Sequence, residues 1–284
     1  MAIRFRTGLD LPARQPSIRL DERMVAMGSC FSQAIGHRLA DGGVDVAVTP
    51  MGILFNPISI GRCIERALNG AEYTDADLFR DQNGVYHVLD FESRCQSPNA
   101  SRLLEEVNIR FKNFSKQLVE ADRWLITFGT AWCFNHLPTD KVVGNCHKLP
   151  DSQFERRLAS VGEIVGQWSD ILEHAPHVVF TVSPVRHLNN GLHGNTLSKS
   201  RLHLAIEQLC DRFDNAEYFP AYEALIDDLR DYRFYADDMK HPSAMAEDYI
   251  FELFTNCYFS NSDRGVIEQN RRESRRNQHR PILE

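Results

Sequence analysis

The sequence lacks an apolar run of about 18 residues, the length that a membrane-spanning helix needs. Its first residues, MAIRFRTGLDLPARQ, contain no continuous apolar core like that of a secretory signal peptide. Basic residues are not in excess either, since 32 Lys and Arg against 39 Asp and Glu give a net charge of -7. A general nucleic-acid binder would need a basic face. We therefore expect a cytoplasmic protein with no membrane span and no nucleic-acid partner.

The chain also has no C-x-x-C pair, the usual metal clip. Its seven cysteines are an odd number at scattered spacings, which does not predict a disulfide framework. Apart from Cys30 and Cys146, we interpret them as buried free thiols. The polar run Asn145-Cys146-His147-Lys148 does not have the fixed spacing of a zinc site. We accordingly predict no metal and no cofactor.

Strand and helix patterns alternate along the 284 residues, a length that suits one large α/β domain. Short apolar segments at 23–28, 44–48, 124–128, 177–183 and 217–219 predict five strands. Apolar residues at helical spacing predict helices after Phe31, from Phe154 to Leu172, after a cap at Ser198, and after a cap at Ser243. This alternation predicts a doubly wound sheet with strand order 2-1-3-4-5.

Two segments depart from the alternation. Residues 70–120 are irregular and polar, and we interpret them as an insertion between the second and third strands that covers part of the site. Residues 259–284 form an Arg-rich polar tail, for which we expect a solvated, partly disordered segment. A docked tail or an interaction arm, including one that contacts nucleic acid, is the alternative.

Polar clusters follow the predicted strands, at the edge where open parallel sheets bind ligands. Gly28-Ser29-Cys30 follows the first strand and Met51-Gly52 the second. Gly129-Thr130 follows the third strand, Arg186-His187 the fourth, and Asp238 and His241 come after the fifth. Convergence of these segments predicts one site.

Asp238 and His241 are three residues apart, about one helical turn, so the carboxylate and the imidazole can lie side by side. Asp238 would then bind one ring nitrogen of His241 and fix its tautomer, and the other nitrogen would take a proton from a nucleophile. The alternative is an ordinary surface turn.

Ser29 and Cys30 are both candidate nucleophiles. Ser29 needs a general base, whereas Cys30 is intrinsically more reactive, and a helix N-terminus with an imidazolium would lower its pKa. The alternatives are a Ser29 that only caps the helix and a Cys30 that packs under the sheet. The remaining candidates are oxyanion or substrate-binding residues: Gly52, Asn56, Gly129, Thr130, Asn145, His147 and Arg186. For Arg186, a structural salt bridge is equally open.

The chain resembles the GSCFA family, whose name-giving motif corresponds to Gly28-Ser29-Cys30-Phe31-Ser32, with Ser32 in place of the final Ala. Further stretches are similar: MGILFNP (51–57), FGTAW (128–132), NCHKLP (145–150), TVSPVRH (181–187), SKS (198–200) and DLRDYRFYADDMKHPS (228–243). The resemblance covers residues 21–258. The family is grouped with SGNH/GDSL-like hydrolases. It implies a flavodoxin-like, three-layer α/β/α fold with a mainly parallel five-stranded sheet, and acyl-ester chemistry.

In the wider class the nucleophile lies two positions after the glycine, a register that the resemblance places on Cys30 rather than Ser29. The usual Gly-x-Asn-Asp block is replaced by Gly129-Thr130-Ala131-Trp132, so Asn56 and Asn145 are the candidates for an oxyanion asparagine. The leading hypothesis is an esterase that acts on an acylated small molecule, lipid or carbohydrate. An O-acyltransferase and a non-catalytic ligand-binding module are the alternatives.

Overall fold

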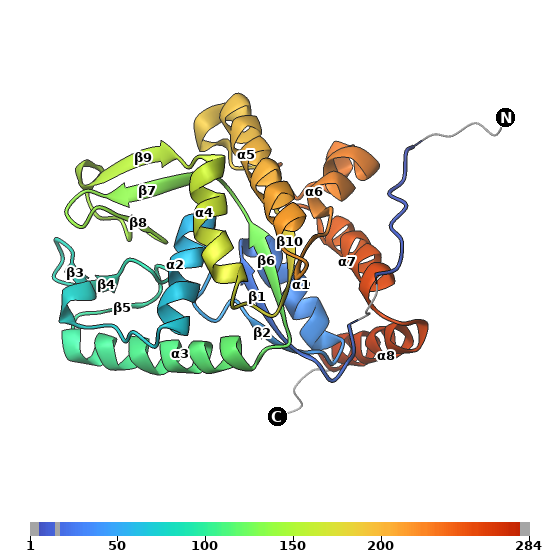
Figure 1. Cartoon of the computed structure of the whole chain (residues 1–284), viewed down its shortest axis with the longest axis horizontal. Coiled ribbons are helices and arrows are strands. Elements are labelled where there is room, and N and C mark those ends of the chain that lie inside the picture. Colours follow the sequence, from blue (N-terminus) through green and yellow to red (C-terminus); the bar gives the residue numbers. More distant parts are fainter. Residues whose placement is uncertain (1–5, 15–17, 279–284) are drawn as a thin grey trace.

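The computed structural model describes residues 6–14 and 18–278, which form a three-layer α/β/α arrangement around one central sheet (Figure 1). The sheet has five parallel strands: β1 (Arg23–Gly28), β2 (Asp45–Val48), β6 (Arg123–Phe128), β10 (His177–Val182) and β11 (Ala216–Tyr218). Their order in the sheet is β2-β1-β6-β10-β11, and all four pairings are parallel. The predicted fold class and the predicted 2-1-3-4-5 order are thereby confirmed.

Helices cover both faces of this sheet (Figure 1). One face packs against α2 (Pro57–Leu68), α3 (Ala100–Glu120), α4 (Val161–Leu172) and α5 (Gly191–Arg212). The other packs against α1 (Cys30–Asp41), the short α6 (Ala221–Glu223) and α7 (Ala244–Tyr258). Strands β1, β6 and β10 are almost entirely buried because helices lie on both sides of them. Their carboxyl ends are therefore held rigidly.

Short one-turn elements join these parts. Four 3₁₀ helices lie at Asp75–Asp77, Asp151–Gln153, Leu188–Asn190 and Tyr232–Phe234, and a π-helical turn lies at Ala224–Leu229.

Two small antiparallel sheets lie outside the central layer, and neither follows from the sequence pattern (Figure 1). The first, within 70–120, consists of β3 (Leu78–Arg80), β4 (Tyr86–Val88) and β5 (Gln96–Ser97). The second consists of β7 (Trp132–His136), β8 (Lys141–Val143) and β9 (Phe154–Leu158). The 70–120 segment is thus more regular than predicted, since the 21-residue helix α3 completes it.

The apolar stripe predicted as one helix from Phe154 to Leu172 is wrong in its first part. Phe154 and Leu158 belong to strand β9, and helix α4 begins only after Ser160, whose side chain accepts a hydrogen bond from the Glu163 N–H. Spacing of four residues satisfies both a helix and the same face of a strand. Antiparallel pairing with β7 makes this segment a strand rather than the start of a helix.

Ser198 is not a helix cap, contrary to the prediction. Helix α5 begins seven residues earlier, at Gly191, so Ser198 lies within it. Its hydroxyl instead accepts the Ala131 N–H at 2.7 Å and bonds the Thr130 hydroxyl at 2.9 Å. Ser243, in contrast, caps α7 as predicted, because its hydroxyl accepts the Ala246 N–H.

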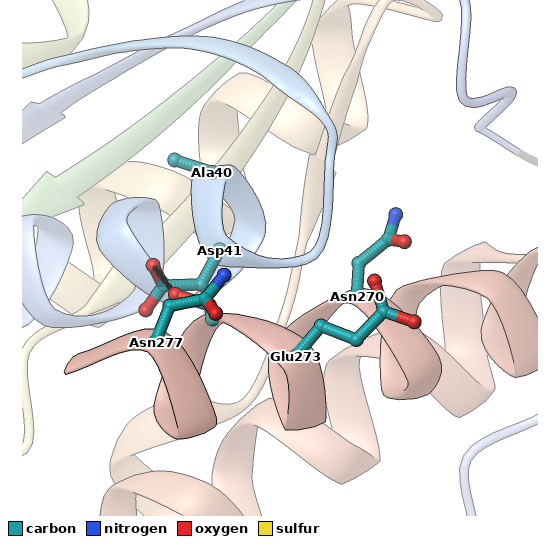
Figure 2. A pocket seen from close by; sticks show the side chains of 6 residues that line it. Ala40, Asp41, Asn270, Glu273 and Asn277 are labelled. Carbon is teal, nitrogen blue, oxygen red and sulfur yellow. Dashed lines mark hydrogen bonds between the residues drawn. The ribbon is translucent and has the colours of Figure 1, made fainter. Parts of the chain in front are cut away.

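The predicted solvated tail is largely a docked helix, α8 (Asn261–Gln278). Its Ile267 is buried, Asn270 donates to the Gly42 carbonyl oxygen at 2.9 Å, and Arg271 bonds Asp248 of α7 at 2.7 Å. A polar hollow of about 590 Å³ lies between the end of α1 and α8, where Asp41 faces the α8 side chains (Figure 2). The expectation of a disordered tail is wrong for 261–278, and residues 279–284 of that prediction lie outside the described residues.

Within residues 6–14 and 18–278, no helix combines the length and apolar character needed to cross a membrane. The same residues contain no group of three or more His, Cys, Asp or Glu side chains arranged to hold a metal ion.

Candidate functional site

The candidate site lies at the carboxyl ends of β1, β6 and β10, where Gly28 makes the sharp turn from β1 into α1. Gly28 has a φ of 134°, and a Cβ atom there would lie 2.1 Å from the Thr127 carbonyl oxygen. Only glycine fits this turn, which places Ser29 and Cys30 at the N-terminus of α1. The sequence prediction of a sharp glycine turn is therefore correct.

Ser29 is the helix cap. Its side chain accepts a hydrogen bond from the Phe31 N–H at 3.3 Å, and the residue is fully buried. Its own N–H donates to the Thr127 carbonyl oxygen. The capping role that the sequence left open is thus the one the structure gives Ser29.

Cys30 is the first residue of α1 and is partly exposed. Burial raises the pKa of its thiol, while the N–H groups of Phe31 and Cys30 act in the opposite direction. The prediction of a lowered pKa is wrong in its net sign, because desolvation outweighs the helix N-terminus. Cys30 is consequently a neutral thiol at pH 7 and needs a base to become a nucleophile.

Asp238 and His241 form the pair that their spacing predicts. The Asp238 carboxylate accepts the His241 ring N–H at Nδ1, with an Oδ2–Nδ1 distance of 2.6 Å. Its other oxygen accepts the backbone N–H groups of Lys240 and His241 at 2.9 and 3.0 Å. These hydrogen bonds hold the pKa of Asp238 well below its usual range. The carboxylate therefore stays ionised and fixes His241 with Nε2 facing away from it.

Arg186 holds this turn in place. Its backbone N–H donates to the Lys240 carbonyl oxygen at 3.1 Å, and its guanidinium donates to the Met239 carbonyl oxygen at 3.2 Å. The guanidinium also lies over the ring of Tyr235, 5.2 Å from its centroid. Among the described residues Arg186 forms no ion pair with a carboxylate, so the salt-bridge alternative is not what the contacts show, whereas its role with substrate stays a prediction. It positions the segment that carries Asp238 and His241.

Glu247, near the start of α7, interacts electrostatically with both Cys30 and His241. Burial raises the pKa of both Cys30 and Glu247; the charge of Glu247 adds to the shift of Cys30, whereas Arg38 and, more weakly, His241 oppose the shift of Glu247. Glu247 forms an ion pair with Arg38 of α1 at 3.0 Å. This ion pair links α1 to the start of α7, the helix that follows the turn of Asp238 and His241.

Lys199 is a functional candidate that the sequence analysis did not single out. It is only 2% exposed, and its Nζ donates to the carbonyl oxygens of Gly129 and Ser183 at 2.7 and 2.6 Å. Burial lowers its pKa to about 7, and the charge that Cys30 carries when it is ionised opposes this shift. A signal was present, since Lys199 lies three residues before Leu202 and seven before Ile206, on the predicted apolar face.

Gly129 and Thr130 close the site from the end of β6. Both backbone N–H groups donate to the Phe55 carbonyl oxygen, at 2.8 and 2.9 Å, and are therefore not available to an oxyanion. A Cβ atom at Gly129 would lie 2.9 Å from that oxygen, 3.2 Å from Ser29 Cβ and 3.4 Å from His187 Nε2. Gly129 thus lies between the α1 N-terminus and His187, where there is no room for a side chain.

Gly129→Ala is expected to destabilise the fold by about 1–3 kcal/mol, because the added methyl group meets backbone and a buried side chain. Gly162→Ala in α4 is the matched control, since nothing lies within 4 Å of its Cβ position. That substitution is expected to leave stability unchanged or raise it by up to about 1 kcal/mol. Urea unfolding of both variants checks this, and equal midpoints would contradict the packing at Gly129.

The predicted oxyanion donor Gly52 is engaged elsewhere, because its N–H donates to the Thr49 carbonyl oxygen at 2.7 Å. Asn56 and Asn145 are better placed. Each uses its side-chain oxygen to accept a backbone N–H, of Ser59 and His147 respectively, both at 2.8 Å. These bonds orient the amides so that each Nδ2 remains a donor.

His147 is packed away from the site, contrary to its predicted role with substrate. It is buried beside His87, and its Nε2 donates to the Phe91 carbonyl oxygen at 3.1 Å. Burial and the charge of His87 lower the pKa of His147 to about 4. His147 therefore stays neutral and supports the loop that presents Asn145.

Comparison with known proteins gives one match. A family model described as GSCFA family matches residues 23–254, which include β1 through most of α7 and every candidate residue. Neither the curated proteins nor the solved structures contain a significant match.

Proposed function

The chain belongs to the GSCFA family, and we propose that it is an acyl-ester hydrolase of the SGNH/GDSL-like type in which Cys30 is the nucleophile. The observation that carries the proposal is the 2.6 Å bond between Asp238 and His241 Nδ1, which leaves Nε2 free to act as a base. The proposal directs this base at the partly exposed thiol of Cys30. The five-stranded parallel sheet supports it, because the three residues come from loops at the same sheet edge.

In the proposed reaction His241 Nε2 takes the proton of the Cys30 thiol as sulfur attacks the ester carbonyl carbon. The tetrahedral intermediate collapses, the carbon–oxygen bond to the alcohol breaks, and His241 returns the proton to the departing alcohol. Water, deprotonated by His241, then attacks the thioester and releases the acid and the free thiol. Asp238 orients the imidazole and stabilises its protonated form throughout.

The oxyanion of the intermediate needs donors with free N–H groups. The Cys30 N–H lies at the start of α1, where backbone donors have no partner within the helix. The Nδ2 groups of Asn56 and Asn145 are the side-chain candidates, in place of the missing Gly-x-Asn-Asp block. The amide groups of Gly52, Gly129 and Thr130 are not part of this set, since carbonyl oxygens already accept from them.

Turnover of p-nitrophenyl acetate and butyrate tests the proposal, with hydrolysis expected and its rate sensitive to thiol alkylation. Because burial raises the pKa of Cys30, iodoacetamide labelling should still accelerate above about pH 9.5, where an ordinary exposed thiol, with a pKa of about 8.5, has nearly levelled off. Peptide mapping identifies the labelled residue. Absence of turnover together with labelling that levels off below pH 8 would contradict this assignment.

Two other functions are outcomes of the same assay. An O-acyltransferase would pass the acyl group from Cys30 to an added alcohol in preference to water. A non-catalytic binding module would show no turnover with any ester.

A further inference from the structure

A cavity of about 430 Å³ opens beside the strand-end site and is not explained by the proposed reaction alone. One wall comes from the strand-end loops and includes Phe55, Asn56 and His187. The opposite wall comes from the small sheet of β7, β8 and β9 and includes Trp132, Phe134 and Arg156. Its volume suits a small molecule, since ligand pockets typically measure about 300–1,000 Å³.

Arg156 is the only formally charged residue that lines this cavity, counted over the part of the chain that the structure describes. Its guanidinium lies 5.4 Å from the ring centroids of both Trp132 and Phe134. It makes no hydrogen bond or ion pair with any described residue, so its planar set of N–H donors is unused. The next residue on the strand, Arg157, is instead paired with Glu163 at 2.6 and 2.8 Å. No carboxylate lines the cavity to neutralise Arg156.

The polar groups that reach the cavity are mainly donors. Asn56 and Asn145 both line it, and their side-chain oxygens are occupied by backbone N–H groups, which leaves their Nδ2 atoms to donate. The aromatic rings of Phe55, Trp132 and Phe134 supply flat apolar surface. A ligand that fits this lining has acceptor oxygens, a negative charge and an apolar or planar body.

His187 connects the cavity with the proposed nucleophile. Its ring lines the cavity and contacts Phe55 edge-on, with ring centroids 5.4 Å apart. Its Nε2 lies beside Gly129, which also packs against Ser29. That Nε2 atom is buried without a hydrogen-bond partner among the described residues. Burial, with the charges of Lys199, His241 and Arg156, lowers the pKa of His187 to about 4, so it stays neutral. The cavity thus adjoins the N-terminus of α1 through one neutral side chain.

We propose that this cavity binds the non-reacting part of the ester substrate, and that Arg156 recognises a carboxylate or phosphate group on it. The proposal rests on the proposed function for the ester and adds the substrate class, an anionic acyl ester. Guanidinium forms paired hydrogen bonds with either oxyanion, and the aromatic wall holds it ready for them.

Isothermal titration calorimetry with the Cys30→Ala protein, which cannot turn over the ester, tests the proposal. The ligands are 4-acetoxybenzoate, 4-acetoxyphenyl phosphate and the neutral methyl 4-acetoxybenzoate. At least one anion is expected to bind about tenfold or more tightly than the neutral ester. The tighter of the two anions assigns the group as carboxylate or phosphate. Equal affinity for all three ligands would overturn the proposal.

Arg156→Gln, combined with Cys30→Ala, is expected to remove this preference, whereas the control Arg157→Gln, on the neighbouring residue, is expected to keep it. Arg156 is exposed, so its replacement leaves the core intact. A preference that survives Arg156→Gln overturns the assignment of Arg156. If the wild-type protein cleaves no ester while the anion preference and its loss are observed, the proposed hydrolase activity fails and the anion site stands.

Discussion

Replacing Cys30 with alanine is expected to reduce ester hydrolysis by about 1,000-fold or more, because the nucleophile of a covalent mechanism cannot be bypassed. The expected loss is in kcat, with little effect on folding, since Cys30 is partly exposed at the start of α1. Steady-state kinetics with p-nitrophenyl butyrate measures it. Far-ultraviolet circular dichroism confirms that the variant is folded.

Ser29→Ala and Cys210→Ala are the matched controls for this prediction. Ser29→Ala removes the helix cap and is expected to cost about 1 kcal/mol of stability while most activity remains. Cys210 is another partly exposed thiol, on α5, and its replacement is expected to leave kcat unchanged. A Ser29→Ala variant that is inactive, next to an active Cys30→Ala variant, would move the nucleophile to Ser29.

His241→Ala is expected to lower kcat by about 100- to 10,000-fold, the usual contribution of a general base. Asp238→Asn separates two roles of the carboxylate. An asparagine oxygen can still accept the N–H groups of Lys240 and His241 that shape the turn, but the negative charge beside His241 Nδ1 is lost. We therefore expect a native turn and a kcat that falls by up to about 10,000-fold.

His174→Ala is the control for the histidine substitution, because His174 is exposed just after α4 and lines no candidate site. It is expected to retain full activity. Since the side chains of Asp238 and His241 are 44% and 47% exposed, their variants should unfold close to the wild-type temperature. Wild-type kcat in both site variants would mean that the pair is an ordinary surface turn.

The central sheet could be predicted from the sequence because its strands are short and its three central strands are apolar and buried on both faces. The pattern could not reveal β9, since Phe154 and Leu158 satisfy helix and strand spacing alike, and the choice depends on pairing with β7, some twenty residues away. Helix α8 was missed for a related reason. Its composition is polar, and it is held by contacts with Asp248 and Gly42, which lie far away in the chain.

The candidate site also contains features that the sequence predicts and features that it does not. The pairing of Asp238 with His241 and the turn at Gly28 are local, so spacing and residue type are sufficient to predict them. The surroundings of Lys199 and Arg156 could not be predicted, because the carbonyl oxygens and rings that contact them come together only in the folded chain. The pKa of Cys30 was predicted with the wrong sign because the degree of burial cannot be read from the motif.

Acyl-enzyme trapping tests the central claim most directly. The wild-type protein is mixed with p-nitrophenyl butyrate, quenched in acid within milliseconds, and analysed by intact mass and peptide mapping. The account predicts one added butyryl group, carried by Cys30 as a hydroxylamine-sensitive thioester, and its accumulation is expected to decrease in His241→Ala. A butyryl group on Ser29, or hydrolysis without any acylated protein, would contradict the account.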